Sequence, residues 1–207
     1  MTQAVTKILH AISQSLEVPV IIVLLILIAA AIVIIGWIIA EYFNEHRHMD
    51  VKLPELMDKI RAGHSTVEEC IKDSGMLKTQ KAALIEVTKH KDFTDVMLDS
   101  LTDELIEREQ ARYDKTLKIT NLMAKLGPVF GLLGTLIPLG PGIIALGQGD
   151  TTTLSNSLLI AFDTTVAGLI VSAVAIIVST IRNTWYSRYM SALETIMDCV
   201  VEMEKMK

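Results

Sequence analysis

The chain is too apolar for an ordinary soluble domain: 51% of its 207 residues are hydrophobic, and its mean hydropathy is +0.44. A net charge of −5, spread with mixed signs, gives no indication of nucleic-acid binding. The two cysteines, Cys70 and Cys199, have neither metal-ligand spacing nor enough partners for a disulfide framework, so we expect no metal and no other cofactor. Composition predicts a small membrane protein.

The first 40 residues predict a surface helix followed by a membrane span. Residues 1–17 place Val5, Ile8, Ile12 and Leu16 on one helical face, which is typical of an amphipathic helix lying on a membrane surface. Residues 18–40 then carry no charge. As a helix this stretch is about 35 Å long, enough to cross the hydrocarbon core of a bilayer. We therefore expect an outer amphipathic segment and a first transmembrane helix.

Residues 41–125 are polar and predict a helical domain on the inner side of the membrane. Pro54 suits the first turn of a helix that ends near Gly63, and a capping-box pattern at residues 65–68 opens a second helix that ends by Gly75. A third should cover residues 79–89. No glycine or proline occurs between residues 92 and 126. We expect one long helix from about residue 93 that continues into the second span.

The second span, residues 126–146, combines small residues with helix-bending ones. The candidates for these roles among its glycines and prolines are Gly127, Gly131, Gly134, Pro138 and Pro141. Glycines at such spacing let helices approach closely in lipid, and prolines remove backbone donors and bend a helix. Thr135 is the one hydroxyl in this span. Residues 147–154 should form a short outer turn.

The third span, residues 155–181, contains a single charged residue, Asp163. A carboxyl group near the middle of a membrane span costs roughly 2.5–3.5 kcal/mol on insertion scales, so we expect it to have a hydrogen-bonding partner or a function. Thr164, Thr165 and Gly168 follow it directly. This composition favours a lined pore or a tight helix contact over a lipid-facing surface. Residues 182–207 should extend the span as a cytoplasmic C-terminal helix.

The basic residues predict the orientation. Of the nineteen Lys and Arg residues, all but Lys7 lie between residues 41 and 125 or after residue 181. The positive-inside rule then places the N-terminus outside and the C-terminus in the cytoplasm. The sequence as a whole predicts an all-α membrane protein with three transmembrane helices, the second and third extending as long helices into a helical cytoplasmic domain.

Two motifs in the second and third spans resemble the MotA/TolQ/ExbB proton channel family. The first is Gly-Pro-Val-Phe-Gly-Leu-Leu-Gly-Thr at residues 127–135. The second is Ala161-Phe162-x-Thr164-Thr165-x-x-Gly168. The order of the predicted segments also fits the three-span TolQ and ExbB branch. The motifs cover about residues 127–170, and the architecture covers most of the chain.

The resemblance implies a homopentameric ring in a prokaryotic inner membrane, enclosing a dimer of a single-span partner of the ExbD, TolR or MotB type. The partner supplies the proton-binding Asp, and ion flow moves the partner relative to the ring. Thr135 and Thr165 would line the inner pore, where a hydroxyl can both donate and accept a hydrogen bond. Thr164 and Asp163 are further candidates for this ion path.

The chain departs from the TolQ and ExbB pattern at one position. Those members carry a Glu five residues before the Thr that matches Thr165, and here that position is Ile160. Asp163 lies nearly one helical turn further on. Two hypotheses follow. Asp163 either replaces the Glu as a titrating pore residue, or holds the ring together through hydrogen bonds to Thr164, Thr165 or a neighbouring subunit's Thr135.

Three other functions are alternatives to a proton-driven motor. A sodium-driven motor of the same architecture would use the same hydroxyls and carboxylate. A non-conducting oligomeric scaffold would use the glycine-rich faces for packing alone. Residues 147–150 match the short G-x-G-D pattern of intramembrane aspartyl proteases, but a glycine-rich turn explains it and Asp150 lies outside the apolar spans. We expect a protein that is not an enzyme.

Overall fold

A computed structural model describes residues 2–43, 53–62, 67–90 and 93–205, and every element in these ranges is a helix. In chain order the helices are α1 (Thr2–Ser15), α2 (Glu17–Glu41), α3 (Leu53–Ala62), α4 (Val67–Asp73), α5 (Lys78–Lys89), α6 (Asp95–Gly147) and α7 (Thr151–Lys205). They form two compact units. The membrane unit comprises Met1–Trp37 and Lys118–Thr180, and the helical unit comprises Ile38–Leu117 and Ile181–Lys207.

Among the described residues, three helical segments are long and apolar enough to cross a membrane: Ala11–Glu41, Asp95–Gly147 and Thr151–Met203. Each contains an apolar stretch of 18 residues with at most two Asp, Glu, Lys or Arg residues, which is unusual for a helix that meets water. The prediction of an all-helical, multi-pass membrane protein is confirmed at this level.

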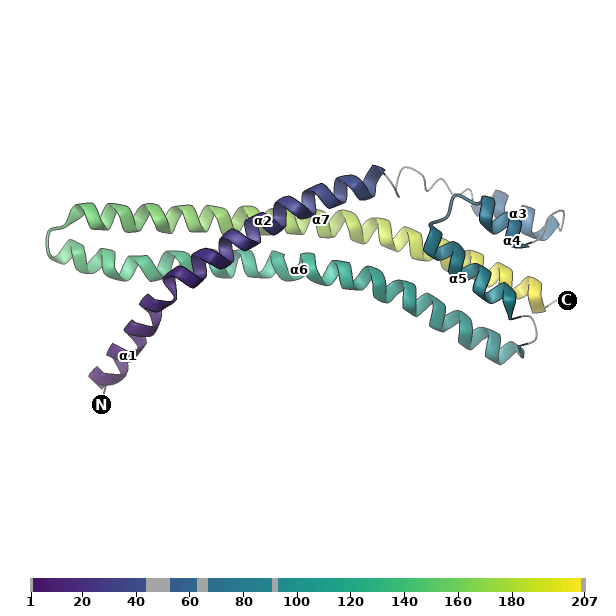
Figure 1. Ribbon diagram of the computed structural model, residues 1–207, viewed down its shortest axis with the longest axis horizontal. Coiled ribbons are helices and arrows are strands. Elements are labelled where there is room, and N and C mark those ends of the chain that lie inside the picture. The colour runs from purple at the N-terminus through teal and green to yellow at the C-terminus, as the bar shows by residue number, and fades with distance from the viewer. Residues whose placement is uncertain (1, 44–52, 63–66, 91–92, 206–207) are drawn as a thin grey trace. The chain divides into compact units, whose positions relative to one another are not determined.

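Within the membrane unit, α6 and α7 form an antiparallel hairpin, and α2 crosses one face of it (Figure 1). One stripe of α2 is buried, at the three- and four-residue spacing of a packed helix face: Val20, Leu24, Leu27, Ala31 and Ile34. The predicted apolar face of α1 is exposed, with Val5 62% and Ile8 61% accessible. Its attachment to the outer membrane surface stays a prediction.

The two long helices are continuous. The expected long helix begins at Asp95 and runs through the second span to Gly147, with Pro128, Pro138 and Pro141 inside it. The third span and the C-terminal segment form one helix, α7, which begins at Thr151. The outer turn is therefore shorter than the predicted residues 147–154.

The helical unit has a conventional hydrophobic core. The predicted short helices are present as α3, α4 and α5, within one or two residues of the expected bounds. Residues 65 and 66 of the predicted capping box lie outside the described residues. Apolar side chains from these helices meet the ends of α6 and α7 and include Ile71, Leu84, Val87, Leu98, Leu105, Leu193, Ile196, Met197 and Val200.

A buried polar cluster in this unit ties the end of α2 to α7. The Arg182 Nε donates to the Glu41 carboxylate at 3.0 Å, and the two side chains are only 1% and 8% exposed. The Tyr186 hydroxyl donates to the other carboxylate oxygen at 2.7 Å. The Tyr186 ring in turn stacks on Tyr113 of α6, with centroids 4.4 Å apart. The charge of Glu41 is thus compensated by two donors in a site that water hardly reaches.

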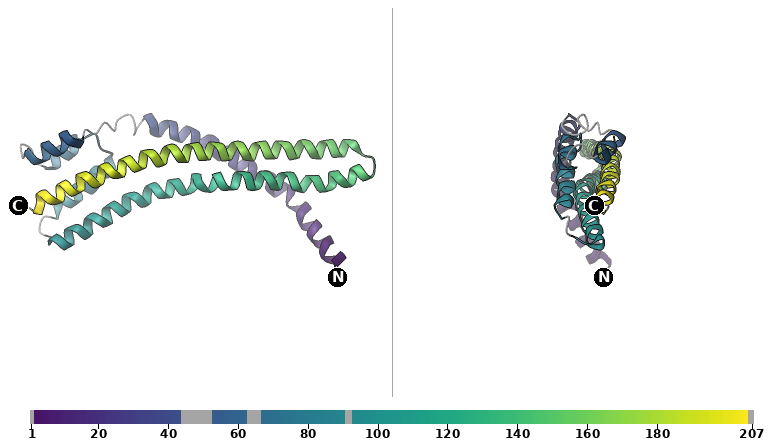
Figure 2. Two further views of the ribbon diagram at one scale, coloured as in Figure 1. Left: turned by 180° about the vertical axis from the view of Figure 1, so that it is seen from behind. Right: turned by 90° about the vertical axis from the view of Figure 1, so that its right-hand side faces the viewer.

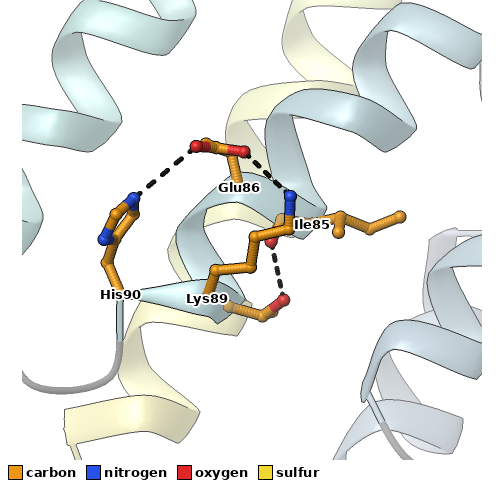
Figure 3. A network of polar contacts seen from close by, with 5 residues as sticks. Ile85, Glu86, Lys89 and His90 are labelled. Atoms are coloured by element: carbon orange, nitrogen blue, oxygen red, sulfur yellow. Dashed lines mark hydrogen bonds and ion pairs between the residues drawn. The ribbon is translucent and has the colours of Figure 1, made fainter.

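A second ionic group, at the end of α5, lies at the surface in contact with solvent (Figure 3). Lys89 lies 3.2 Å from the Glu86 carboxylate, and the His90 Nε2 lies 3.6 Å from its other oxygen. The hydrogen bond and charge of Lys89 lower the pKa of Glu86 below its ordinary value. Exposed pairs of this kind contribute little to stability.

Candidate functional site

The α6–α7 contact is built on glycines that bring the two backbones together. A Cβ added at Gly127 would lie 2.6 Å from the Gly168 carbonyl oxygen, and one added at Gly168 would lie 2.9 Å from the Gly131 Cα. Because these neighbours are backbone atoms, no side chain can rotate away to make room. The small-residue spacing predicted from the sequence is therefore a close helix–helix contact, as expected in lipid.

Thr164 belongs to this contact. A Cβ at Gly134 would lie 2.6 Å from the Thr164 Cβ, so the absence of a side chain at Gly134 makes the space that Thr164 occupies. Thr164 is buried, and its hydroxyl donates to backbone carbonyls of its own helix, with distances of 2.9 Å to Ile160 and 3.0 Å to Ala161. The arrangement makes Thr164 a packing residue in the single chain rather than one exposed to a pore.

Thr135 and Thr165 lie on the same side of the hairpin. Each directly follows a buried contact residue, Gly134 on α6 and Thr164 on α7. Successive residues of a helix are offset by about 100°, so both threonines are turned from the contact by the same angle. In an antiparallel pair, equal rotations in the chain direction lead to the same side. The two predicted pore residues thus share one edge of the hairpin.

Both hydroxyls are half-buried and donate to their own helix. Thr135 bonds to the Leu132 carbonyl at 2.7 Å, and Thr165 bonds to the Ala161 carbonyl at 3.0 Å. Each hydroxyl oxygen keeps lone pairs that can accept a hydrogen bond from water or a hydrated ion. The site therefore offers two neutral oxygen ligands on one polar edge.

Helix α2 covers the opposite face. It lies in front of the hairpin in Figure 1 and behind it in the reversed view of Figure 2. On α7, Val174 is half-buried whereas Ile176 is 53% exposed, so the side with Val174 is the covered one. Thr165 lies eleven residues before Ile176, which is about three full helical turns and hence the same side. We call the side that bears Thr135, Thr165 and Ile176 the uncovered face.

Asp163 does not join the two threonines. It lies eleven residues before Val174, and so it is on the side of α7 that α2 covers further along the helix. Residues two apart on a helix do not face the same way, so Asp163 and Thr165 cannot both point to one path from a single helix. Asp163 is exposed. The Thr164 and Thr165 hydroxyls, which one of the two hypotheses bonded to Asp163, donate to backbone carbonyls within the chain.

The outer turn explains the glycines and the acid at residues 147–150. Gly149 has a φ of 79°, in the left-handed region that favours glycine. The Asp150 carboxylate accepts the Thr153 backbone N–H at 3.0 Å, which caps the first turn of α7. This hydrogen bond and one from the Thr153 hydroxyl lower the pKa of Asp150. Both residues thus have a structural role in a helix–helix turn.

The two prolines near this turn lie within α6. Pro138 is buried and Pro141 is half-buried, and the helix continues through both. Gly142, one turn after Pro138, lies where a Cβ would come 3.0 Å from the Ser157 Cβ. The close contact of α6 and α7 thus extends up to the turn. Among the described residues, no three His, Cys, Asp or Glu side chains gather in a way that could hold a metal ion.

Comparison with known proteins identifies the family of this chain. A family model described as the MotA/TolQ/ExbB proton channel family matches residues 64–195. The chain belongs to the MotA/TolQ/ExbB proton channel family. It is also similar to the biopolymer transport protein exbB1 of Vibrio cholerae serotype O1, with 26% identity over 115 residues. That match covers 54% of this chain and 50% of the relative, so the chain spans about half the length of the curated relative.

Hydrogen bonds of Ser172 and Ser179 across α6 and α7 were not predicted from the sequence. The Ser172 hydroxyl donates to the Ala124 carbonyl at 2.8 Å, and the Ser179 hydroxyl donates to the Asn121 side-chain oxygen at 2.5 Å. The signal that could have found them is the seven-residue spacing of Thr165, Ser172 and Ser179. That spacing keeps side chains along one seam of two packed helices.

Proposed function

We propose that this chain is the ring-forming subunit of an inner-membrane ion channel that converts ion-motive force into movement of a single-span partner protein. The observation that carries the proposal is that Thr135 and Thr165 share the uncovered face of the hairpin, opposite α2. A ring of copies with this face inward would place a layer of hydroxyls around its centre and α2 on its outside. Protons are the ion that membership of a proton channel family favours.

A partner is needed because the uncovered face lacks an acid. Asp163, the one charge between residues 155 and 181, lies on the other side of α7. Neutral hydroxyls can solvate and relay a proton but cannot hold its charge at ordinary pH. We therefore infer that the titrating carboxylate comes from a dimer of an ExbD-, TolR- or MotB-like partner in the centre of a pentamer.

The charge distribution supports an orientation with the N-terminus outside and the C-terminus in the cytoplasm. Eighteen of nineteen basic residues would then lie on the inner side. Inward flow of one positive charge releases about 2.3 kcal/mol per 100 mV of membrane potential. A sodium-driven motor would work on the same energy scale, and the threonine oxygens suit either ion.

The experiment is flux through the reconstituted complex. The chain would be co-expressed with a single-span partner of the ExbD, TolR or MotB type, purified and placed in liposomes, and proton entry would be followed under an imposed potential. Thr135→Val and Thr165→Val keep the side-chain shape but remove the hydroxyl, and we expect each to reduce flux at least tenfold. Thr195→Val is the matched control, because Thr195 is an exposed hydroxyl of α7 in the helical unit that bonds to the Ser191 carbonyl at 2.8 Å.

The outcomes separate the channel from a scaffold. Loss of flux in both threonine variants, with normal ring assembly and a normal control, supports the channel. Assembly with no proton or sodium flux in the native complex would leave the glycine contacts as packing alone, and would overturn the proposal. If sodium but not protons carries the flux, the ion in the proposal is sodium and the proposed channel architecture stands.

A further inference from the structure

The membrane unit contains a second polar pair on α6 and α7, at the end of the hairpin away from the turn. The Ser179 hydroxyl of α7 donates to the Asn121 side-chain oxygen of α6 at 2.5 Å. Asn121 is exposed and Ser179 is half-buried. Unlike the hydroxyls of Thr135, Thr165 and Ser172, which bond to backbone carbonyls, that of Ser179 bonds to a side chain across the two helices.

The Asn121–Ser179 pair is separated from the Thr135–Thr165 pair by the same number of residues on both helices. Asn121 lies fourteen residues before Thr135 on α6, and Ser179 lies fourteen residues after Thr165 on α7. Fourteen residues are two heptads, a step that keeps a side chain on the same seam of a packed helix pair. The step corresponds to about 21 Å along each axis. Because the helices run antiparallel, both steps lead away from the turn, and the two residues meet again on the uncovered face.

The burial pattern supports this position independently of the spacing. Asn121 directly follows the fully buried Thr120, as Thr135 follows buried Gly134. Buried Val178 likewise precedes Ser179, as buried Thr164 precedes Thr165. All four polar residues are therefore turned from the helix contact in the same direction, by about 100°.

We propose that Asn121 and Ser179 form a second polar layer of the ion path, at its inner end, where a hydrated monovalent cation passes between the threonine layer and the aqueous phase. This inference rests on the proposed function. With the Ser179 proton donated to Asn121, the amide N–H groups and the hydroxyl lone pairs remain for water. The pair is neutral, so it solvates an ion without trapping it. Lys118 and Lys125, one turn to either side of Asn121 on α6, are both exposed basic groups.

The test places charges of opposite sign at Asn121. Asn121→Asp keeps an oxygen that can accept the Ser179 hydroxyl and adds a negative charge, whereas Asn121→Lys adds a positive one. A unit charge about 6 Å from the path in water changes the local cation concentration by about threefold. We expect cation flux to rise about threefold in the first variant and to fall about threefold in the second. Both changes should shrink in high salt.

Ile181→Asp and Ile181→Lys are the matched controls. Ile181 lies two residues after Ser179 on α7, but it is exposed and turned about 200° away from Ser179 round the helix. These variants should leave flux unchanged. If the Asn121 variants change flux in the same direction, or if the Ile181 variants act equally, the pair serves only to join the helices and the inference is overturned.

A set of flux measurements distinguishes this inference from the proposed function. If Thr135→Val and Thr165→Val leave flux intact, the channel proposal itself fails. If they abolish flux while charges at Asn121 have no effect, the channel stands and the inner layer is wrong. If Asn121→Lys does not assemble, the Asn121→Asp variant and the salt dependence of its flux give the same decision.

Discussion

The same two helices are held together by different chemistry in the two units. In the membrane unit, α6 and α7 meet through the backbones of Gly127, Gly131 and Gly168. In the helical unit, their ends are held by large side chains such as Leu105, Leu193 and Met197. Lipid provides no hydrophobic force between helices, so close dispersion contact decides packing there, whereas water drives the burial of large apolar groups. A helix that passes between the two solvents changes its packing residues accordingly.

The largest predicted effect is in the helical unit, at the buried ion pair. Arg182→Ala leaves the Glu41 carboxylate buried without its cation, which we expect to destabilise the unit by about 3–5 kcal/mol. The measurement is chemical denaturation of the purified protein, followed by tyrosine and tryptophan fluorescence.

The control for that prediction removes both charges. Glu41→Leu combined with Arg182→Leu should recover a large part of the loss, because replacing a buried ion pair with apolar residues is often close to neutral. If the double variant is as unstable as the single one, the pair contributes through packing rather than through charge.

The next effect concerns the membrane unit. Gly168→Ala puts a methyl group against the Gly127 and Gly131 backbones, and we expect a loss of about 1–3 kcal/mol from overpacking, seen as lower thermal stability and fewer assembled rings. Gly140→Ala is the control, since nothing lies within 4 Å of a Cβ at that position. Equal behaviour of the two variants would show that the close contact does not hold the hairpin.

A smaller effect is expected from substitution of Asp163, which lies on the side of the hairpin opposite the uncovered face. Asp163→Asn keeps the size of the side chain and most of its hydrogen-bonding capacity. Because Asp163 lies away from the uncovered face, flux should be retained, with at most a modest loss of ring stability. Normal assembly with abolished flux would make Asp163 a titrating residue of the path and would contradict its placement.

The smallest effect is expected at the exposed pair on α5. Glu86→Gln should leave stability at neutral pH unchanged within error, because solvent screens this carboxylate. Since Lys89 lowers its pKa, any contribution is present above the ordinary carboxylate pKa and is lost as the pH falls through the folded-state value. An NMR titration of Glu86 that gives an ordinary or raised pKa would contradict this.

Much of the fold could be predicted from the sequence because the decisive signals are local. The absence of glycine and proline before residue 126 predicted the continuous helix α6, and the glycine spacing predicted its close contact. The sequence could not predict which of Asp163, Thr164 and Thr165 lies on the uncovered face, since this depends on which side of the hairpin α2 covers. The pairs Glu41–Arg182 and Asn121–Ser179 were also missed, because their members are 141 and 58 residues apart in the chain.

The most direct test of the central claim is a cryo-electron microscopy structure of the complex with its single-span partner in lipid. We predict a five-fold ring whose centre is lined by Thr135 and Thr165, with α2 on the outside and Asp163 directed away from the central partner helices. A monomer, or a ring in which α2 faces the centre and the two threonines face lipid, would contradict it.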